Sequence, residues 1–133
     1  MATTILVVDD EPDVVEIVRF RLEKDGYHVL SANDGREGLA AAIAKSPDLV
    51  VLDVMMPGLD GFEVLRRLRR DPAYAAVGAA MPVILLTARA DFTAKAQGWE
   101  EYADEYVTKP FNADELARTV QNLLSHSGKI HAR

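Results

Sequence analysis

The sequence predicts an α/β fold in which helices cover both faces of one parallel sheet of five strands. Five short apolar runs alternate with segments of helical periodicity along the chain. Several of the runs are apolar at consecutive positions, as in strands buried on both faces of a sheet. The length of 133 residues suits one domain with one core, and no repeat is found beyond the strand–helix unit.

The predicted strands are short and rich in Val, Ile and Leu. They cover Thr4–Val8, Tyr27–Ser31, Asp48–Leu52, Pro82–Leu86 and Asp104–Thr108. The connections between parallel strands should be right-handed crossovers.

The predicted helices follow the strands in turn. They cover Pro12 to the residue before Gly26, Glu37–Ala44, Phe62–Arg70, Asp91–Glu101, and a last helix capped by Asn112 or Asp114 that carries Leu124. Residues 71–81 are expected to form a longer connection. The basic run Arg66, Arg67, Arg69 and Arg70 is interpreted as a solvated helix face.

Composition excludes several classes of function. Apolar residues make up 49% and charged residues 27%, as in soluble globular proteins, and the net charge of −6 disfavours direct binding to nucleic acid or anionic membranes. The absence of cysteine excludes disulfides, thiolate metal sites and thiol catalysis. We expect no signal peptide and no membrane span, and therefore a cytoplasmic location by default.

Polar residues follow the predicted strands where their carboxyl ends should meet. Asp9 and Asp10 follow the first strand, Asp53 the third, Thr87 the fourth and Lys109 the fifth. Ligands of open parallel sheets bind outside these strand ends, at the topological switch point. Carboxylates crowded there repel one another unless a cation joins them, and hard oxygen ligands suit Mg²⁺ or Mn²⁺.

These residue types fit phosphoryl transfer onto a carboxylate. Asp53 is the candidate nucleophile, Asp9 and Asp10 are candidate metal ligands, and Lys109 and Thr87 are candidate contacts of the phosphoryl oxygens. The alternative is a set of separate acids, each of which caps its own turn.

Four motifs, in order, resemble the receiver domain of two-component response regulators. They are Val7–Glu11, Asp53–Gly61, Leu86–Ala88 and Tyr106–Phe111, and the match runs from about Thr4 to about Leu124. The resemblance implies a flavodoxin-like sheet in the order 2-1-3-4-5 with five helices. It also implies that Asp53 accepts a phosphoryl group from a histidine kinase or phosphotransfer protein.

The resemblance assigns further roles. It implies that Asp10, Asp53 and the backbone carbonyl of Met55 hold Mg²⁺, with Asp9 close by, and that the bond from Lys109 to Pro110 is cis. Its switch would draw Thr87 toward the phosphoryl group and rotate Tyr106 inward. That would remodel the face made by the fourth helix, fifth strand and fifth helix, which a downstream protein or effector domain would read.

The sequence departs from the family pattern near the fourth predicted helix. Tyr102 stands where glycine is usual and Trp99 where leucine is common, and Phe92 adds a third aromatic residue. These side chains are either a partner surface or packing.

Charged residues on the same face bear on dimerisation and on dephosphorylation. Lys95, Asp104 and Arg118 match positions of cross-dimer ion pairs in the winged-helix branch of the family, so we hypothesise a weak dimer that phosphorylation enhances. Arg89, two residues after Thr87, is expected to affect dephosphorylation more than phosphorylation.

Competing functions remain open. An aspartyl-nucleophile phosphatase would need an acid where Met55 stands, and a nucleotide- or flavin-binding module would need a glycine-rich phosphate loop that is absent. A receiver-like module that binds partners without phosphorylation is the main alternative. We expect no external enzymatic product, a receiver domain over residues 1–125, and a tail or linker over 126–133.

Overall fold

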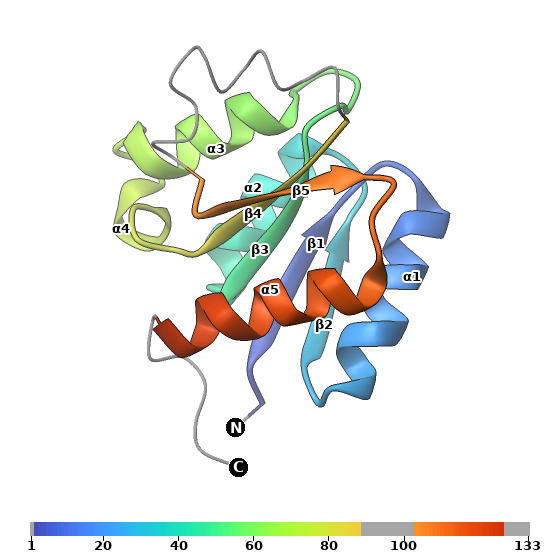
Figure 1. The fold of residues 1–133 in the computed structure, drawn as a ribbon. Helices are drawn as coiled ribbons and strands as arrows, with labels where there is room; N and C mark the ends of the chain where they lie inside the picture. The colour runs from blue at the N-terminus through green and yellow to red at the C-terminus, as the bar shows by residue number, and fades with distance from the viewer. Residues whose placement is uncertain (1, 89–102, 127–133) are drawn as a thin grey trace.

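The computed structural model describes residues 2–88 and 103–126. Its core is one five-stranded sheet in the order β2-β1-β3-β4-β5, and every neighbouring pair is parallel (Figure 1). The strands are β1 (Thr4–Val8), β2 (His28–Ala32), β3 (Leu49–Asp53), β4 (Val83–Ala88) and β5 (Glu105–Lys109). The predicted fold class and strand order are confirmed.

Helices cover both faces of this sheet. They are α1 (Pro12–Lys24), α2 (Gly35–Lys45), α3 (Gly61–Arg70), α4 (Ala75–Gly78) and α5 (Ala113–His126). α1 and α5 lie on one face, and α2, α3 and α4 lie on the other (Figure 1).

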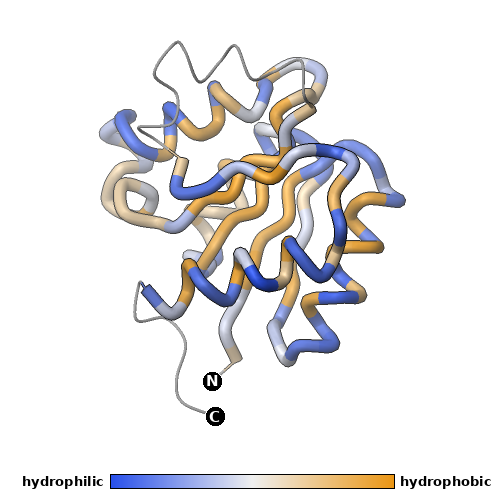
Figure 2. The backbone as a smooth tube through the Cα atoms, viewed as in Figure 1, coloured by the Kyte–Doolittle hydropathy of each residue, from blue (hydrophilic) through white to orange (hydrophobic). Residues whose placement is uncertain are grey.

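The strands alternate their side chains between two apolar cores. In β1, Ile5 and Val7 join the core under α1 and α5, while Leu6 and Val8 join the core under α2 and α3. All five residues of β3 are buried. Figure 2 shows the result: the central strands are mostly apolar, and the helices alternate apolar and polar residues. Consecutive apolar residues are therefore needed because a central parallel strand has no solvent-facing side.

Local signals in the sequence set most helix boundaries. Pro12 is the first residue of α1, and Gly26 follows that helix with a φ of 95°. Asp34 and Asp60 cap α2 and α3, and each side chain accepts a hydrogen bond from the backbone N–H three residues later.

The connection between α3 and β4 differs from the prediction. A short helix, α4, lies within residues 71–81, where only an irregular connection was expected. Gly78 allows it to pack closely, since a Cβ at that position would lie 2.6 Å from the Leu68 carbonyl oxygen. The helix predicted over 91–101 lies outside the described residues, as do Arg89, Phe92, Lys95, Trp99 and Tyr102.

The basic run on α3 is only partly solvated, so its interpretation as a solvated face is wrong for one member. The Arg69 side chain is 10% exposed and donates to the carbonyl oxygens of Gly78, at 2.7 Å, and Met81. It also pairs with Asp104 at 3.0 Å. Arg66 and Arg67 pair with Glu63 near the surface, as the interpretation requires.

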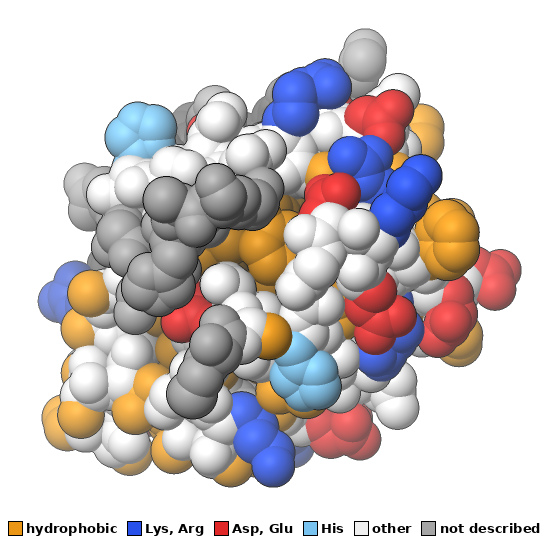
Figure 3. Space-filling view, turned by 90° about the horizontal axis from the view of Figure 1, so that it is seen from below, with side chains coloured by type: hydrophobic (Ala, Val, Ile, Leu, Met, Phe, Trp, Pro, Cys, Tyr) orange, Lys and Arg blue, Asp and Glu red, His pale blue; other side chains and the backbone are white. Residues whose placement is uncertain are grey.

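No helix in the described ranges is long and apolar enough to cross a bilayer. Seen from the amino ends of the strands, the surface carries acidic and basic side chains interspersed with apolar ones (Figure 3). Among the described side chains on that face, basic residues form no broad patch of the kind that binds nucleic acid.

Candidate functional site

The site lies at the carboxyl ends of the central strands, where the register aligns the predicted residues. Val8 of β1 pairs with Leu52 of β3, so Asp9 and Asp53 come next on adjacent strands. On the other side of β3, Asp53 pairs with Leu86 of β4, one residue before Thr87. Lys109 ends β5 and pairs with Ala88. The sheet thus brings together side chains that are up to 100 residues apart in the sequence.

Asp53 is buried at the bottom of this site, with an exposed fraction of 2%. Its Oδ1 accepts from Lys109 Nζ at 3.0 Å and from the backbone N–H of Met55 at 3.4 Å. Its Oδ2 has no hydrogen-bond partner among the residues that the structure describes. A buried carboxylate oxygen without a donor is costly, so this atom is suited to a ligand that the site acquires.

Lys109 is the cation at the centre of the site. Besides Asp53, its Nζ contacts Asp9 Oδ2 at 3.2 Å and Glu11 Oε1 at 3.3 Å. The Lys109–Pro110 peptide bond is cis, which confirms the expectation drawn from the family resemblance.

Burial and neighbouring charges together shift the pKa values of Asp53 and Lys109. Burial raises the pKa of Asp53 from its ordinary 3.8 to about 6, and the charge of Asp9 adds to this shift, while Lys109 and the Met55 N–H oppose it. Burial lowers the pKa of Lys109, but its contacts with Asp53 and Asp9 outweigh burial and leave the pKa above its ordinary value. Asp53 is therefore mostly ionised at pH 7, and Lys109 is fully charged.

The loop from β3 to α3 fits closely around Asp53. A Cβ on Gly61 would lie 2.3 Å from the Asp53 carbonyl oxygen, so only glycine can start α3 this near the strand end. Gly58 adopts a φ of 77°, which favours glycine on conformational grounds. The Pro57-Gly58 turn and the Asp60 cap thus fix the path of the backbone from Asp53 to the start of α3.

The remaining predicted site residues lie near this cluster. Thr87 is buried, and its hydroxyl donates to the Ala88 carbonyl oxygen at 3.0 Å. Tyr106 is half-buried and packs against the core under α2 and α3. Met55 lies directly after the site with an exposed side chain. Their roles in signalling, and that of the Met55 carbonyl as a ligand, stay predictions.

The acidic residues fit a divalent metal ion. Asp9, Asp10, Glu11 and Asp53 each offer a carboxylate oxygen, and these oxygens lie within 4.8 Å of one another. Asp9 and Asp53 are buried, while Asp10 and Glu11 are exposed at the mouth. Mg²⁺ prefers hard oxygen ligands, and Asp53 Oδ2 is a buried oxygen that no donor in the described part of the chain reaches. The cluster is thus of the type that holds Mg²⁺ in receivers.

Glu11 was given no separate role from the sequence, although it closes the run of three acids that the sequence shows. Its contact with Lys109 could not be inferred, because it depends on where β5 ends relative to β1. Asp104 lies away from the site, and its carboxylate is held by Arg69 and by the Val83 N–H at 2.8 Å.

Comparisons with known proteins agree with this geometry. A family model described as the response regulator receiver domain matches residues 5–121. The chain is 43% identical over 126 residues to the DNA-binding dual master transcriptional regulator RpaA of Synechocystis sp., covering 95% of this chain and 51% of that protein. It is 42% identical to the alkaline phosphatase synthesis transcriptional regulatory protein PhoP of Bacillus subtilis, covering 96% and 50%.

Solved structures show the same fold. The chemotaxis protein CheY4 of Vibrio cholerae superposes with a TM-score of 0.81 at 32% identity, covering 93% of this chain and 100% of that one. The receiver domain of the Francisella response regulator 1452 gives 0.82 at 33% identity, covering 94% and 98%.

The chain spans about half the length of the curated relatives it matches, whereas it matches nearly all of the isolated receivers. The match extends from the strand before Asp9 into the last helix, and so includes every element that builds the acidic site. The chain therefore belongs to the response regulator receiver domain family of two-component signal transduction.

Proposed function

We propose that this receiver is a phosphoacceptor switch in which Asp53 takes a phosphoryl group from a histidine kinase or phosphotransfer protein. The observation that carries the proposal is the buried, mostly ionised Asp53: a lysine holds its Oδ1, and no donor in the described ranges reaches its Oδ2. A carboxylate of this kind is a competent nucleophile toward phosphorus.

The proposed step needs little acid–base chemistry. A bond forms between an Asp53 carboxylate oxygen and phosphorus, and the bond from phosphorus to the donor breaks, with its electron pair leaving on the donor. Because the attacking carboxylate carries no proton, no base has to remove one. Lys109 and the Thr87 hydroxyl would contact the phosphoryl oxygens, and the same side chains would act when water later hydrolyses the acyl phosphate.

Asp10, Asp53 and the Met55 carbonyl would hold Mg²⁺, with Asp9 nearby, and the bound ion would neutralise charge on the transferred group. We thus propose that the chain catalyses only its own phosphorylation and dephosphorylation. The family is not one of conventional enzymes.

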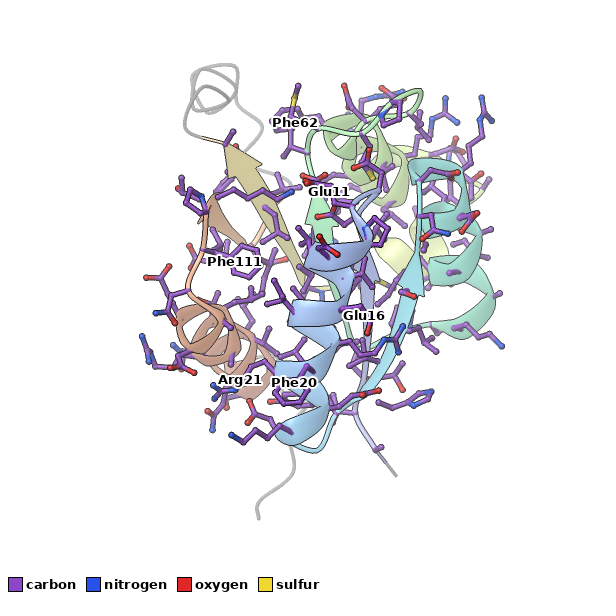
Figure 4. The ribbon with its side chains drawn as sticks, turned by 90° about the vertical axis from the view of Figure 1, so that its right-hand side faces the viewer. Glu11, Glu16, Phe20, Arg21, Phe62 and Phe111 are labelled. Atoms are coloured by element: carbon purple, nitrogen blue, oxygen red, sulfur yellow. The ribbon has the colours of Figure 1, made fainter. Side chains whose placement is uncertain are left out.

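The surface beside the site suits a protein donor. Met55, Ile17 and Phe20 are the large apolar side chains that stand exposed in the described ranges. Met55 is two residues from Asp53, and the other two lie on α1, which begins at the acidic run. Figure 4 shows Phe20 near the end of that helix away from Glu11, so the apolar surface would extend from the site along α1. Exposed apolar side chains that adjoin a polar centre are typical of docking surfaces.

The output is proposed to pass through a partner protein or an effector domain rather than through direct nucleic-acid binding. The relatives named as transcriptional regulators are about twice as long as the matched region. Movement of Thr87 and Tyr106 would convey phosphorylation to the β5–α5 side. A weak homodimer that phosphorylation enhances stays a prediction, but the intramolecular bonds of Asp104 to Arg69 and Val83 disfavour its use in a cross-dimer ion pair.

The test is the intact mass of the chain after incubation with Mg²⁺ and acetyl phosphate. We expect one added phosphoryl group, absent without Mg²⁺ and absent in Asp53→Asn. The matched control is Asp60→Asn, in the same loop. Asparagine caps a helix as well as aspartate does, and the Asp60 side chain accepts its hydrogen bond from the Glu63 N–H rather than from a residue of the acidic site.

An unmodified but folded wild-type chain would contradict the phosphoacceptor proposal. That outcome would favour the alternative of a receiver-like interaction module, whose partner binding would be unaffected by Asp53→Asn. A cytoplasmic location, a receiver over 1–125 and a tail over 126–133 stay predictions.

A further inference from the structure

Lys109 has more carboxylate partners than its proposed contact with a phosphoryl group requires. A lysine ammonium has three N–H donors, and here they face three carboxylates, those of Asp53, Asp9 and Glu11. To bind an incoming phosphoryl oxygen, the ammonium must exchange one of these partners. Which partner it leaves depends on where each carboxylate lies.

The three partners lie at different depths. Asp9 and Asp53 are almost wholly buried, whereas the Glu11 side chain is 63% exposed. Figure 4 places Glu11 at the end of α1 that faces the site. Two carboxylates therefore attract the ammonium inward, and one attracts it toward the mouth, through which a phosphodonor must enter.

The backbone of Glu11 is a fixed base for this contact. Its N–H donates to Asp9 Oδ1 at 2.9 Å, and its carbonyl oxygen accepts from the N–H groups of Val14 and Val15 at 3.1 and 3.2 Å. It is the N-cap residue of α1, and Pro12 follows it. Its side chain makes no capping bond and is left to reach Lys109.

We propose that Glu11 is a positioning residue that holds the Lys109 ammonium toward the mouth of the site, ready to meet the phosphoryl oxygens. This inference rests on the proposed function of Asp53. An exposed ion pair contributes little to stability, so the expected effect is on reactivity rather than on folding. Without Glu11, the Lys109 ammonium would lie between the buried carboxylates of Asp9 and Asp53, farther from the incoming phosphoryl oxygens.

Two substitutions distinguish the effect of the length of the Glu11 side chain from the effect of its charge. Glu11→Asp keeps the charge but shortens the side chain by one methylene, so it loses contact with Lys109. Glu11→Gln keeps the length but removes the charge that attracts the ammonium. Positioning predicts a lower maximal phosphorylation rate in both, whereas simple repulsion of an anionic donor predicts an unchanged rate for Asp and a faster one for Gln.

The first measurement is the rate of phosphorylation as a function of acetyl phosphate concentration at saturating Mg²⁺. We expect Glu11→Asp to lower the maximal rate about three- to tenfold with little change in the half-saturating concentration. Glu11→Gln should lower the maximal rate similarly and also lower the half-saturating concentration, because it removes a negative charge from the mouth.

The second measurement uses metal-free protein and needs no phosphorylation. In wild type, the three carboxylates should slow hydrogen exchange of the Lys109 ammonium enough to give a ¹⁵N NMR signal, assigned by its loss in Lys109→Met. Both Glu11 variants should accelerate that exchange. Glu16→Asp and Glu16→Gln are matched controls, since Glu16 is an exposed α1 residue that pairs with Arg19 at 3.9 Å.

The proposal is overturned if the Glu11 variants match the Glu16 controls in either measurement, or if Glu11→Gln has the faster maximal rate. If wild type takes up no phosphoryl group, the proposed function of Asp53 fails. The NMR result would then show separately whether Glu11 holds Lys109.

Discussion

Two partly buried cations, Arg69 and Lys109, lie at opposite ends of the sheet, and they differ in how completely neighbouring groups balance their charge. Arg69, near the amino ends, donates to two carbonyl oxygens and pairs with the single carboxylate of Asp104. Lys109, at the carboxyl ends, stands among an excess of carboxylates, and one of them keeps an oxygen without a donor.

The difference distinguishes a structural network from a reactive one. Around Arg69, charge is matched and carbonyl oxygens of the α3–β4 connection are satisfied, so the network fixes α4 and the start of β5. Around Lys109, burial and then the charge of Asp9 raise the pKa of Asp53, and a bound cation would favour the ionised carboxylate. The free energy of unfolding should therefore fall when the Arg69 network is broken and rise when the negative charge around Lys109 is reduced.

The largest expected effect comes from breaking the balanced network. Arg69→Met should lower the free energy of unfolding by about 3 kcal/mol, because it removes the side-chain donor of the Met81 carbonyl oxygen, one of two donors of the Gly78 carbonyl oxygen, and the cation that pairs with Asp104. Urea denaturation measures this. Arg66→Met is the matched control on the same helix, and it should change stability by less than about 0.5 kcal/mol because its pair with Glu63 is exposed. Equal losses in the two variants would contradict a special role for Arg69.

A smaller change in stability, of opposite sign, is expected when Asp53→Asn removes a negative charge from the site around Lys109. The folded protein holds a proton on Asp53 up to about pH 6, whereas the unfolded chain releases it near 3.8. The folded state therefore binds more protons between these values, and stability falls as pH rises through this window. Asp53→Asn should remove that loss and stabilise the metal-free protein by about 1 to 3 kcal/mol at pH 7.

The pH dependence of the Asp53→Asn effect distinguishes a change in ionisation from a change in packing. The gain from Asp53→Asn should shrink as pH falls toward 4, where wild-type Asp53 is protonated in the folded state. Asp13→Asn, an exposed α1 position, should show little gain at either pH. A gain that is the same at pH 4 and pH 7 would mean that packing, rather than ionisation, causes it.

The smallest change in stability is expected from Mg²⁺ binding to the acidic site. Mg²⁺ at ten times its dissociation constant should raise the free energy of unfolding of the wild type by about 1.4 kcal/mol. The increase should vanish in Asp53→Asn and persist in Arg69→Met, measured by thermal unfolding with and without EDTA. An increase of equal size in all three proteins would place the ion elsewhere.

The sequence by itself determined the fold class, the strands and the residues at the ends of those strands. Consecutive apolar residues in Leu49–Leu52, too few for a typical helix, are typical of a parallel strand covered on both faces, and parallel strands place Asp9, Asp53 and Lys109 at one edge of the sheet. Asp60 and Pro12 marked helix starts because capping is a local interaction.

Which charged side chains pair with one another depends on tertiary packing and could not be predicted from the sequence. Arg69 looked like its neighbours on a basic helix face, and its burial depends on how α3 lies against α4 and the start of β5. Glu11 looked like one acid of three, and its contact with Lys109 depends on where two distant strands end. Local patterns carry information on burial and capping, whereas the pairing of long charged side chains depends on distances that the packed elements alone set.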